Sequence, residues 1–97
     1  MAIFITLVNF TDQGIRNIKD SPKRAKAFEE MAKKFGATVK ALYWTQGQYD
    51  MVVAVDAPDE KTMSALILNI GTLGNVRGQT LRAFSAVEMA EILKKMG

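Results

Sequence analysis

The side chains of this 97-residue chain best suited to chemistry gather around one segment, Gly47-Gln48-Tyr49-Asp50, which lies between two apolar runs of β type. Aspartate is depleted in strands, so the presence of Asp50 needs a reason. Its carboxylate either accepts hydrogen bonds from backbone N–H groups near the turn or faces a ligand or partner. In the second case it would bind a polar group or act as a general base, with Arg82 or Arg77 as its cationic neighbour.

Three aromatic residues, Tyr43, Trp44 and Tyr49, surround the same turn. Aromatic pairs across strands stabilise hairpins, and the same rings could instead form the wall of an apolar pocket with a phenol as donor. A two-residue turn at Gln46-Gly47 would pair Trp44 with Tyr49 on one face and Tyr43 with Asp50 on the other. A bulge at the glycine would exchange the faces, so both arrangements stay open.

Two polar residues of the first β-type run, Thr6 and Asn9, complete the candidate ligand site. Polar side chains on a central strand usually have a local hydrogen-bond partner, and the alternative is a place in the pocket. The segment from Gly71 to Asn75 has the glycine content of a phosphate-binding loop. It follows a predicted helix instead of preceding one, which is the wrong end of the helix dipole for an anion. We interpret it as a helix cap and a turn.

The composition excludes several kinds of site. The chain has no cysteine, which removes disulfides, thiol nucleophiles and cysteine metal ligands. It has no histidine, which removes the usual general base at neutral pH and the commonest ligand of zinc and haem iron. We therefore expect no metal and no cofactor, and any catalysis would depend on carboxylates, tyrosines and basic side chains.

The net charge of +3 is concentrated in residues 16–35, which hold seven basic and three acidic side chains. Glu29 precedes Lys33 by four residues, which is the spacing of ion pairs on a solvated helix face. We prefer this interpretation to an anion-binding surface, since no nucleic-acid-binding motif accompanies the charge. No apolar run reaches the roughly 18 residues of a membrane span. We expect a cytoplasmic protein with neither nucleic acid nor membrane as a partner.

Periodicity and turn residues predict a single domain over residues 1–97. Runs of β-branched and aromatic residues predict strands, and apolar residues spaced by three and four predict helices. The sequence Ser85-Ala-Val-Glu88 is a capping box that opens the last helix. We expect this helix to bury one apolar face, made of Met89, Ile92, Leu93 and Met96. The predicted strands cover residues 2–10, 38–45, 49–56 and 75–84, the first two helices begin near Ser21-Pro22 and Pro58, and residues 11–14 form a turn.

The element order β-α-β-β-α-β, followed by the C-terminal helix, is the ferredoxin-like arrangement of the α+β class. Right-handed crossovers put both long helices on one face of a four-stranded antiparallel sheet, with the first and third strands in its centre. The face without helices should be apolar too, because the strands are apolar on both sides. Ile3, Ile5 and Leu7 share one face of the first strand, Phe4, Thr6 and Val8 share the other, and residues 51–55 are apolar throughout. Monomers rarely expose such a patch, so we expect two sheets to pack face to face in a homodimer or a higher homo-oligomer.

Five segments, in the same order along the chain, resemble the GYD domain family, and the resemblance covers essentially the whole chain. The family takes its name from a Gly-x-Tyr-Asp motif. Membership implies the dimeric α/β-barrel superfamily, in which two sheets pack across a dimer. The segments are Ile3-Phe4-Ile5-Thr6-Leu7-Val8-Asn9-Phe10-Thr11-Asp12-Gln13-Gly14, Ser21-Pro22-Lys23-Arg24, Gly47-Gln48-Tyr49-Asp50, Gly74-Asn75-Val76-Arg77 and Thr80-Leu81-Arg82-Ala83-Phe84.

The resemblance implies two classes of function. Some members of the superfamily are effector domains that bind amino acids at subunit interfaces, and others are cofactor-independent oxygenases or isomerases that use the pocket between sheet and helices. We therefore expect a homodimeric small-molecule-binding or sensing module, with a small anionic or amino-acid-like ligand near Tyr49, Asp50 and Arg82. One alternative is a cofactor-independent enzyme with Asp50 as base and Tyr43 or Tyr49 as donor. The other is a structural dimer with no ligand.

Overall fold

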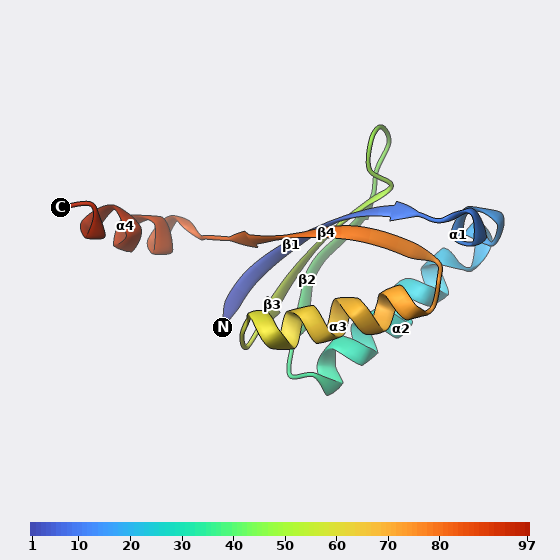
Figure 1. The fold of residues 1–97 in the computed structure, drawn as a ribbon, viewed down its shortest axis with the longest axis horizontal. Helices are drawn as coiled ribbons and strands as arrows, with labels where there is room; N and C mark the ends of the chain where they lie inside the picture. The colour runs from blue at the N-terminus through green and yellow to red at the C-terminus, as the bar shows by residue number, and fades with distance from the viewer.

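The computed structural model describes all 97 residues and confirms the predicted α+β fold. In chain order the elements are β1 (Ala2–Phe10), α1 (Asp12–Arg16), the 3-10 helix η1 (Ile18–Asp20), α2 (Ser21–Lys34), β2 (Thr38–Trp44), β3 (Met51–Ala57), α3 (Glu60–Thr72), β4 (Val76–Ala83) and α4 (Ala86–Lys95). The strands form one antiparallel sheet in the order β2-β3-β1-β4, with the first and third central as predicted. Both long helices, α2 and α3, cover the same face of the sheet (Figure 1). None of the helices is long and apolar enough to cross a membrane.

The covered face of the sheet contains most of the hydrophobic core. Phe4 and Val8 of β1 pair in register with Val55 and Met51 of β3, and all four are buried. The alternation of buried and partly exposed residues along both strands follows from the two-residue period of a pleated strand. The remaining core residues come from the helices and from neighbouring strand positions: Ala32, Ala37, Val53, Ala57, Met63 and Leu66.

The opposite face has no helix on it, and we call it the bare sheet face. At its centre Ile5 pairs with Ala54 of β3 on one side and with Leu81 of β4 on the other. Leu81, on the edge strand, is 40% exposed. The apolar residues of the bare sheet face are Ile3, Ile5, Leu7, Ala41, Tyr43, Val52, Ala54, Leu81 and Ala83.

Side-chain hydrogen bonds cap the start of two of the three main helices. Asp59 caps α3 by accepting a hydrogen bond from the Thr62 N–H at 2.7 Å, and this bond lowers the pKa of Asp59. Ser85 and Glu88 form the predicted capping box of α4. The predicted cap of α2, Ser21, is instead its first helical residue, and it makes no capping hydrogen bond.

Residues 11–20 form two short helical segments where the sequence predicts only a turn. Thr11 caps α1 by accepting a hydrogen bond from the Gly14 N–H, and its own hydroxyl donates to the carbonyl of Gly74. The Thr11 N–H also donates to the carbonyl of Asn75 at 3.1 Å. These bonds to a distant loop hold α1 against the connection between α3 and β4, which is why local turn chemistry did not predict it.

The loop between β2 and β3 is longer than the predicted two-residue turn. Trp44 pairs with Met51 and Tyr43 pairs with Val52, so both predicted pairings across the turn are wrong. The six residues Thr45–Asp50 form the loop, which is closed by a hydrogen bond of 2.8 Å from its first N–H to its last carbonyl. The backbone of the last loop residue bonds on both sides, because its carbonyl accepts from Thr45 and its N–H donates to the carbonyl of Val8 in β1.

The C-terminal helix α4 projects away from the rest of the chain (Figure 1). None of its residues is buried, and Met96 is 77% exposed. The prediction that Met89, Ile92, Leu93 and Met96 are buried is therefore wrong for a single chain. A helix of 10 residues is marginal in water without tertiary packing. The apolar face of α4 thus lacks the tertiary packing that usually stabilises a helix of this length.

The chain exposes more surface than a compact monomer of its size. Its accessible surface is 6642 Å², whereas a monomer of 10.7 kDa exposes about 5,500 Å². Its radius of gyration is 14.5 Å, against about 12.5 Å for a compact domain of this length. The excess surface, about 1,100 Å², is comparable to the roughly 800 Å² that each partner buries in a standard protein interface. The single chain is therefore more extended than a compact monomer of the same length.

Candidate functional site

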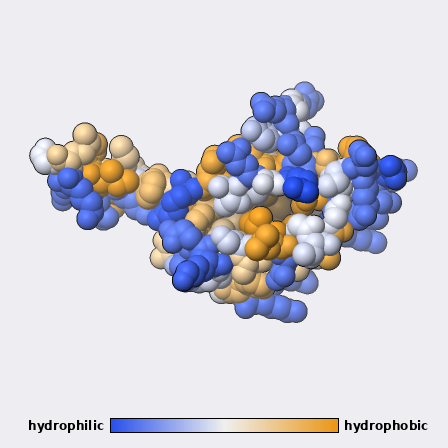
Figure 2. Space-filling model, in the orientation of Figure 1, coloured by the Kyte–Doolittle hydropathy of each residue, from blue (hydrophilic) through white to orange (hydrophobic).

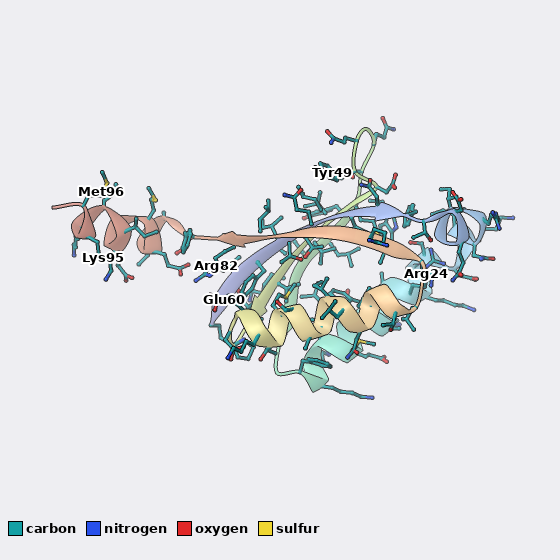
Figure 3. The ribbon with its side chains drawn as sticks, in the orientation of Figure 1. Arg24, Tyr49, Glu60, Arg82, Lys95 and Met96 are labelled. Carbon is teal, nitrogen blue, oxygen red and sulfur yellow. The ribbon has the colours of Figure 1, made fainter.

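The predicted ligand residues fall into two groups at opposite ends of β1. Asp50 bonds to Phe10, whereas Arg82 lies opposite Phe4 in the register with β4. Six residues of strand separate these positions, which is about 20 Å at the usual rise per residue. Tyr49 and Arg82 accordingly lie on separate parts of the molecule (Figure 3). The predicted pairing of Asp50 with Arg82 is therefore wrong.

Asp50 holds the end of the central strand. Its Oδ2 accepts a hydrogen bond from the Phe10 N–H at 2.8 Å, and its own N–H donates to the carbonyl of Val8 at 2.8 Å. The carboxylate thus satisfies a backbone donor at the point where β1 leaves the sheet. The structure supports the first of the two interpretations of Asp50, a local hydrogen-bonding role at the turn.

Replacing Asp50 with alanine should destabilise the fold. The substitution leaves the partly buried Phe10 N–H without its acceptor, at a cost of about 1–3 kcal/mol. In a domain of this size each kcal/mol lowers the melting temperature by about 4–8 °C. Asp50→Asn keeps an acceptor oxygen, so its loss of stability should be less than half that of Asp50→Ala. Thermal unfolding followed by circular dichroism, at one protein concentration, measures the melting temperatures of both variants. Equal decreases in melting temperature would contradict the role of the bond to Phe10.

Arg82 anchors the connection between β4 and α4. Its guanidinium lies 3.4 Å from the Glu88 carboxylate and 4.0 Å from that of Glu60, and its centre is 4.5 Å from the ring centroid of Phe84. The Ser85 N–H donates to Glu88 at 3.1 Å, and this bond, with the contribution of Arg82, lowers the pKa of Glu88. Arg82 is thereby engaged by its own chain, and these contacts set the direction in which α4 leaves the sheet.

The two aromatic residues at the end of β2 lie on opposite faces of the sheet. The Trp44 indole N–H donates to the hydroxyl of Ser21 at 2.9 Å, which ties the edge strand to the start of α2. Tyr43 lies on the bare sheet face and is 65% exposed. Trp44 thus has a structural role, whereas a contact role for Tyr43 requires a second chain.

The remaining predicted site residues, Thr6 and Asn9, also lie apart. Thr6 is buried, and its hydroxyl forms a hydrogen bond of 3.0 Å with that of Thr80, which is the local partner expected on a central strand. Asn9 is exposed and lies between the two β1 residues that Asp50 contacts. The structure therefore brings Asn9 and Asp50 to one end of the sheet, next to Tyr49. Ligand binding by these residues stays a prediction.

A cavity of about 150 Å³ lies between the covered sheet face and the two long helices, and none of the predicted ligand residues lines it. Figure 2 shows a hollow between β4 and α3 with hydrophobic atoms inside it. Twelve of the fifteen lining residues are hydrophobic, among them Phe28 and Met51. The other three, Ser21, Arg24 and Asn75, are polar and include no acidic residue. Such a cavity suits a small apolar molecule with one polar end.

The sequence contained one signal for this cavity. Arg24 precedes Phe28 by four residues and Met31 by seven, so it lies on the apolar face of α2. A cation in that position differs from the other basic residues of α2, which face solvent. No comparable signal existed for Asn75, because only the three-dimensional fold brings its loop beside α2.

Comparison with known proteins decides the family. The sequence matches the pattern of the family described as GYD domain over residues 4–93. The chain belongs to the GYD domain family. It is 34% identical over 95 residues to a Thermus thermophilus protein named glutamine synthetase and cystathionine beta-lyase binding protein. That alignment covers 97% of this chain and 100% of the relative, so the predicted resemblance to the family is confirmed.

Two solved structures share the fold of this GYD domain. The crystal structure of TTHA0845 from Thermus thermophilus matches with a TM-score of 0.57 and 25% identity, over 89% of this chain and 96% of that chain. The crystal structure of FFRP-DM1 matches with a TM-score of 0.61 and 21% identity, over 87% of this chain and 100% of that chain. The second likeness supports the ferredoxin-like fold alone.

Proposed function

We propose that this GYD domain is a homodimeric binding module in which the bare sheet faces of two copies pack together. The observation that carries the proposal is the apolar sheet face centred on Ile5, which no element of the chain covers. The excess exposed surface of the subunit is enough for a standard interface. At about 25 cal/mol per Å², burying several hundred Å² of apolar surface gives on the order of 10 kcal/mol before association costs.

The apolar face of α4 supports the same interface. Met96 points to the side opposite α2 and α3, which is the side of the bare sheet face, and Lys95 points the other way (Figure 3). A second copy stacked on the sheet would extend beyond its rim towards α4. Sheet and helix would then be covered together, with the polar face of α4 left in water.

The name of the relative supports a partner for this dimer. We propose that it binds glutamine synthetase or cystathionine beta-lyase, the two enzymes in the name of the protein that is 34% identical. The alignment covers the full length of that relative, so no extra domain of the relative accounts for its binding. The dimer would act as a protein-binding module and would need no catalytic residue of its own.

Sedimentation velocity and titration calorimetry test the two steps separately. The purified protein should sediment at twice the mass of the chain at micromolar concentration, and Leu93→Lys in α4 should shift it towards the monomer. Sedimentation of the wild-type protein as a folded monomer would overturn the dimer. Titration with the two purified enzymes should give heat with at least one of them. Heat with neither would overturn the partner while leaving the dimer in place.

Small-molecule binding is a second proposed function, and the cavity favours it. The sequence predicts a ligand near Asp50 and Arg82, but the structure instead offers a partly open, mostly apolar cavity with Arg24 in its lining. The enzyme alternative has no comparable support, because the Asp50 carboxylate accepts a backbone N–H and Tyr43 lies on the bare sheet face. Binding of hexan-1-ol, followed by ¹⁵N NMR shifts of cavity residues, tests whether the cavity admits a small molecule; unchanged spectra would discard this function.

A further inference from the structure

We infer that the cavity between sheet and helices binds a small aliphatic carboxylate, whose hydrocarbon chain fills the apolar space and whose carboxylate is bound by Arg24, Ser21 and Asn75. The inference rests on the small-molecule function proposed above and assigns its ligand class. It depends on the composition of the lining, on the unused hydrogen-bond donors of the three polar residues, and on the volume.

Arg24 supplies a positive charge that has no counterion. Its Nη1 donates to the carbonyl of Asn17 at 2.8 Å and its Nη2 donates to the carbonyl of Gly14 at 3.3 Å. Neither partner is charged, and the ion pairs of the structure all involve other basic residues. A guanidinium has five N–H donors, so three remain free. The side chain of Arg24 is partly exposed, and the two carbonyls hold the guanidinium in place without neutralising it.

The other two polar residues also have spare donors. The hydroxyl oxygen of Ser21 accepts from Trp44, which leaves the hydroxyl proton of this buried residue without an acceptor. The Oδ1 of Asn75 accepts from Gln13 at 2.9 Å, which leaves its NH₂ group free to donate. All three polar groups can therefore donate to an oxygen of the same ligand, and none of them carries the negative charge that would pair with an ammonium group.

The fold places these donors near one another. Gly14 accepts a hydrogen bond from Arg24, and a Cβ on Gly14 would lie 2.0 Å from the carbonyl oxygen of Asn75. Arg24 and Asn75 therefore both contact the same residue, Gly14. Ser21 precedes Arg24 by three residues on α2, which puts their side chains on the same side of the helix.

The volume and lining define the rest of the ligand. A dry apolar cavity of about 150 Å³ accommodates a benzene molecule, so a chain of about four to six carbon atoms fits. Twelve hydrophobic lining residues offer no polar group to a second hydrophilic end. The ligand class is thus a monocarboxylate with a plain aliphatic tail, and not an amino acid, whose ammonium group would find no acidic residue in the lining.

Matched six-carbon probes test the inference on the full-length protein. Titrations with hexanoate, hexan-1-ol and hexylamine, followed by ¹⁵N NMR shifts, should give affinities in that order, with hexanoate at least tenfold tighter than hexylamine. Arg24→Met should weaken hexanoate at least tenfold and leave hexan-1-ol within threefold. Lys26→Met removes the same charge from an exposed position of the same helix and should leave hexanoate binding unchanged.

Each other result would overturn the ligand class. Hexanoate could bind no more tightly than hexan-1-ol, or equally tightly to the wild-type and Arg24→Met proteins. Either result would show that the cavity binds apolar molecules without recognising a carboxylate, and the proposed small-molecule function would still hold. Binding of none of the three probes would remove that function as well. Arg24 also joins α1 to α2, so Arg24→Met could fail to fold, and Arg24→Lys then provides a second test. The lysine keeps the positive charge and should retain hexanoate binding. Loss of that binding in a folded Arg24→Lys protein would contradict the role of the charge.

Discussion

The substitution Ile5→Lys is expected to convert the proposed dimer into a folded monomer. Ile5 lies at the centre of the bare sheet face, between Ala54 and Leu81, and a two-fold axis would place it in the interface from both subunits. Losing its burial costs about 1.5–3 kcal/mol per subunit, which weakens dimerisation by about 10²–10⁴-fold. In the monomer the residue is partly exposed, so the lysine stem can lie along the sheet while its ammonium reaches water.

Leu68→Lys is the matched control for this experiment. Leu68 lies on α3 and is 70% exposed, away from the bare sheet face, so the same chemical change there should leave the dimer intact. Sedimentation velocity at several concentrations gives the dissociation constants, and far-ultraviolet circular dichroism verifies that both variants are folded. An Ile5→Lys protein that dimerises as tightly as the Leu68→Lys protein would place the interface elsewhere.

The strands and main helices were predictable because each carries a local pattern. The two-residue alternation of β1 and the apolar spacing of α2 depend only on which residues face the core, and the element order then leaves few topologies. The short helix α1 was not predictable in this way. Its cap, Thr11, is fixed by bonds to Gly74 and Asn75, which are distant in the sequence.

The position of α4 shows a different limit of periodicity. An apolar stripe predicts that a helix face will be covered, and it says nothing about which molecule covers it. The capping box at Ser85 correctly predicted where α4 begins, because that box is a local hydrogen-bond pattern. The same residues that make the helix amphipathic, such as Leu93, would be consistent with packing on its own sheet or on a second copy.

The candidate site was the least predictable feature. The pairing of Asp50 with Arg82 was predicted because both are charged residues of predicted strands. The six-residue loop moves Asp50 to the end of β1, where its carboxylate satisfies the Phe10 N–H. Arg24 could be distinguished from the other basic residues of α2 by its spacing to Phe28, whereas Asn75 reaches the cavity only through the fold.

The largest loss of stability is expected from Gly14→Ala. A Cβ at this position would lie 2.0 Å from the carbonyl oxygen of Asn75 and 2.9 Å from its carbonyl carbon, and both atoms belong to the backbone. The methyl group can fit only if α1 separates from the loop, which breaks the bonds of Thr11 to Gly74 and Asn75. Alanine favours a helix over glycine by about 1 kcal/mol, so the net cost of about 2–4 kcal/mol is what remains after that gain.

The same substitution at Gly71 should raise the stability of the fold instead of lowering it. Gly71 lies in α3, and a Cβ added to it would meet no other atom within 4 Å, so alanine should stabilise the fold by about 0.5–1 kcal/mol. Thermal unfolding of both variants at one protein concentration should give a melting temperature about 10–20 °C lower for Gly14→Ala and a few degrees higher for Gly71→Ala. A Gly14→Ala protein as stable as wild type would mean that α1 does not rest on the Asn75 loop, and the donors assigned to the cavity would no longer be held together.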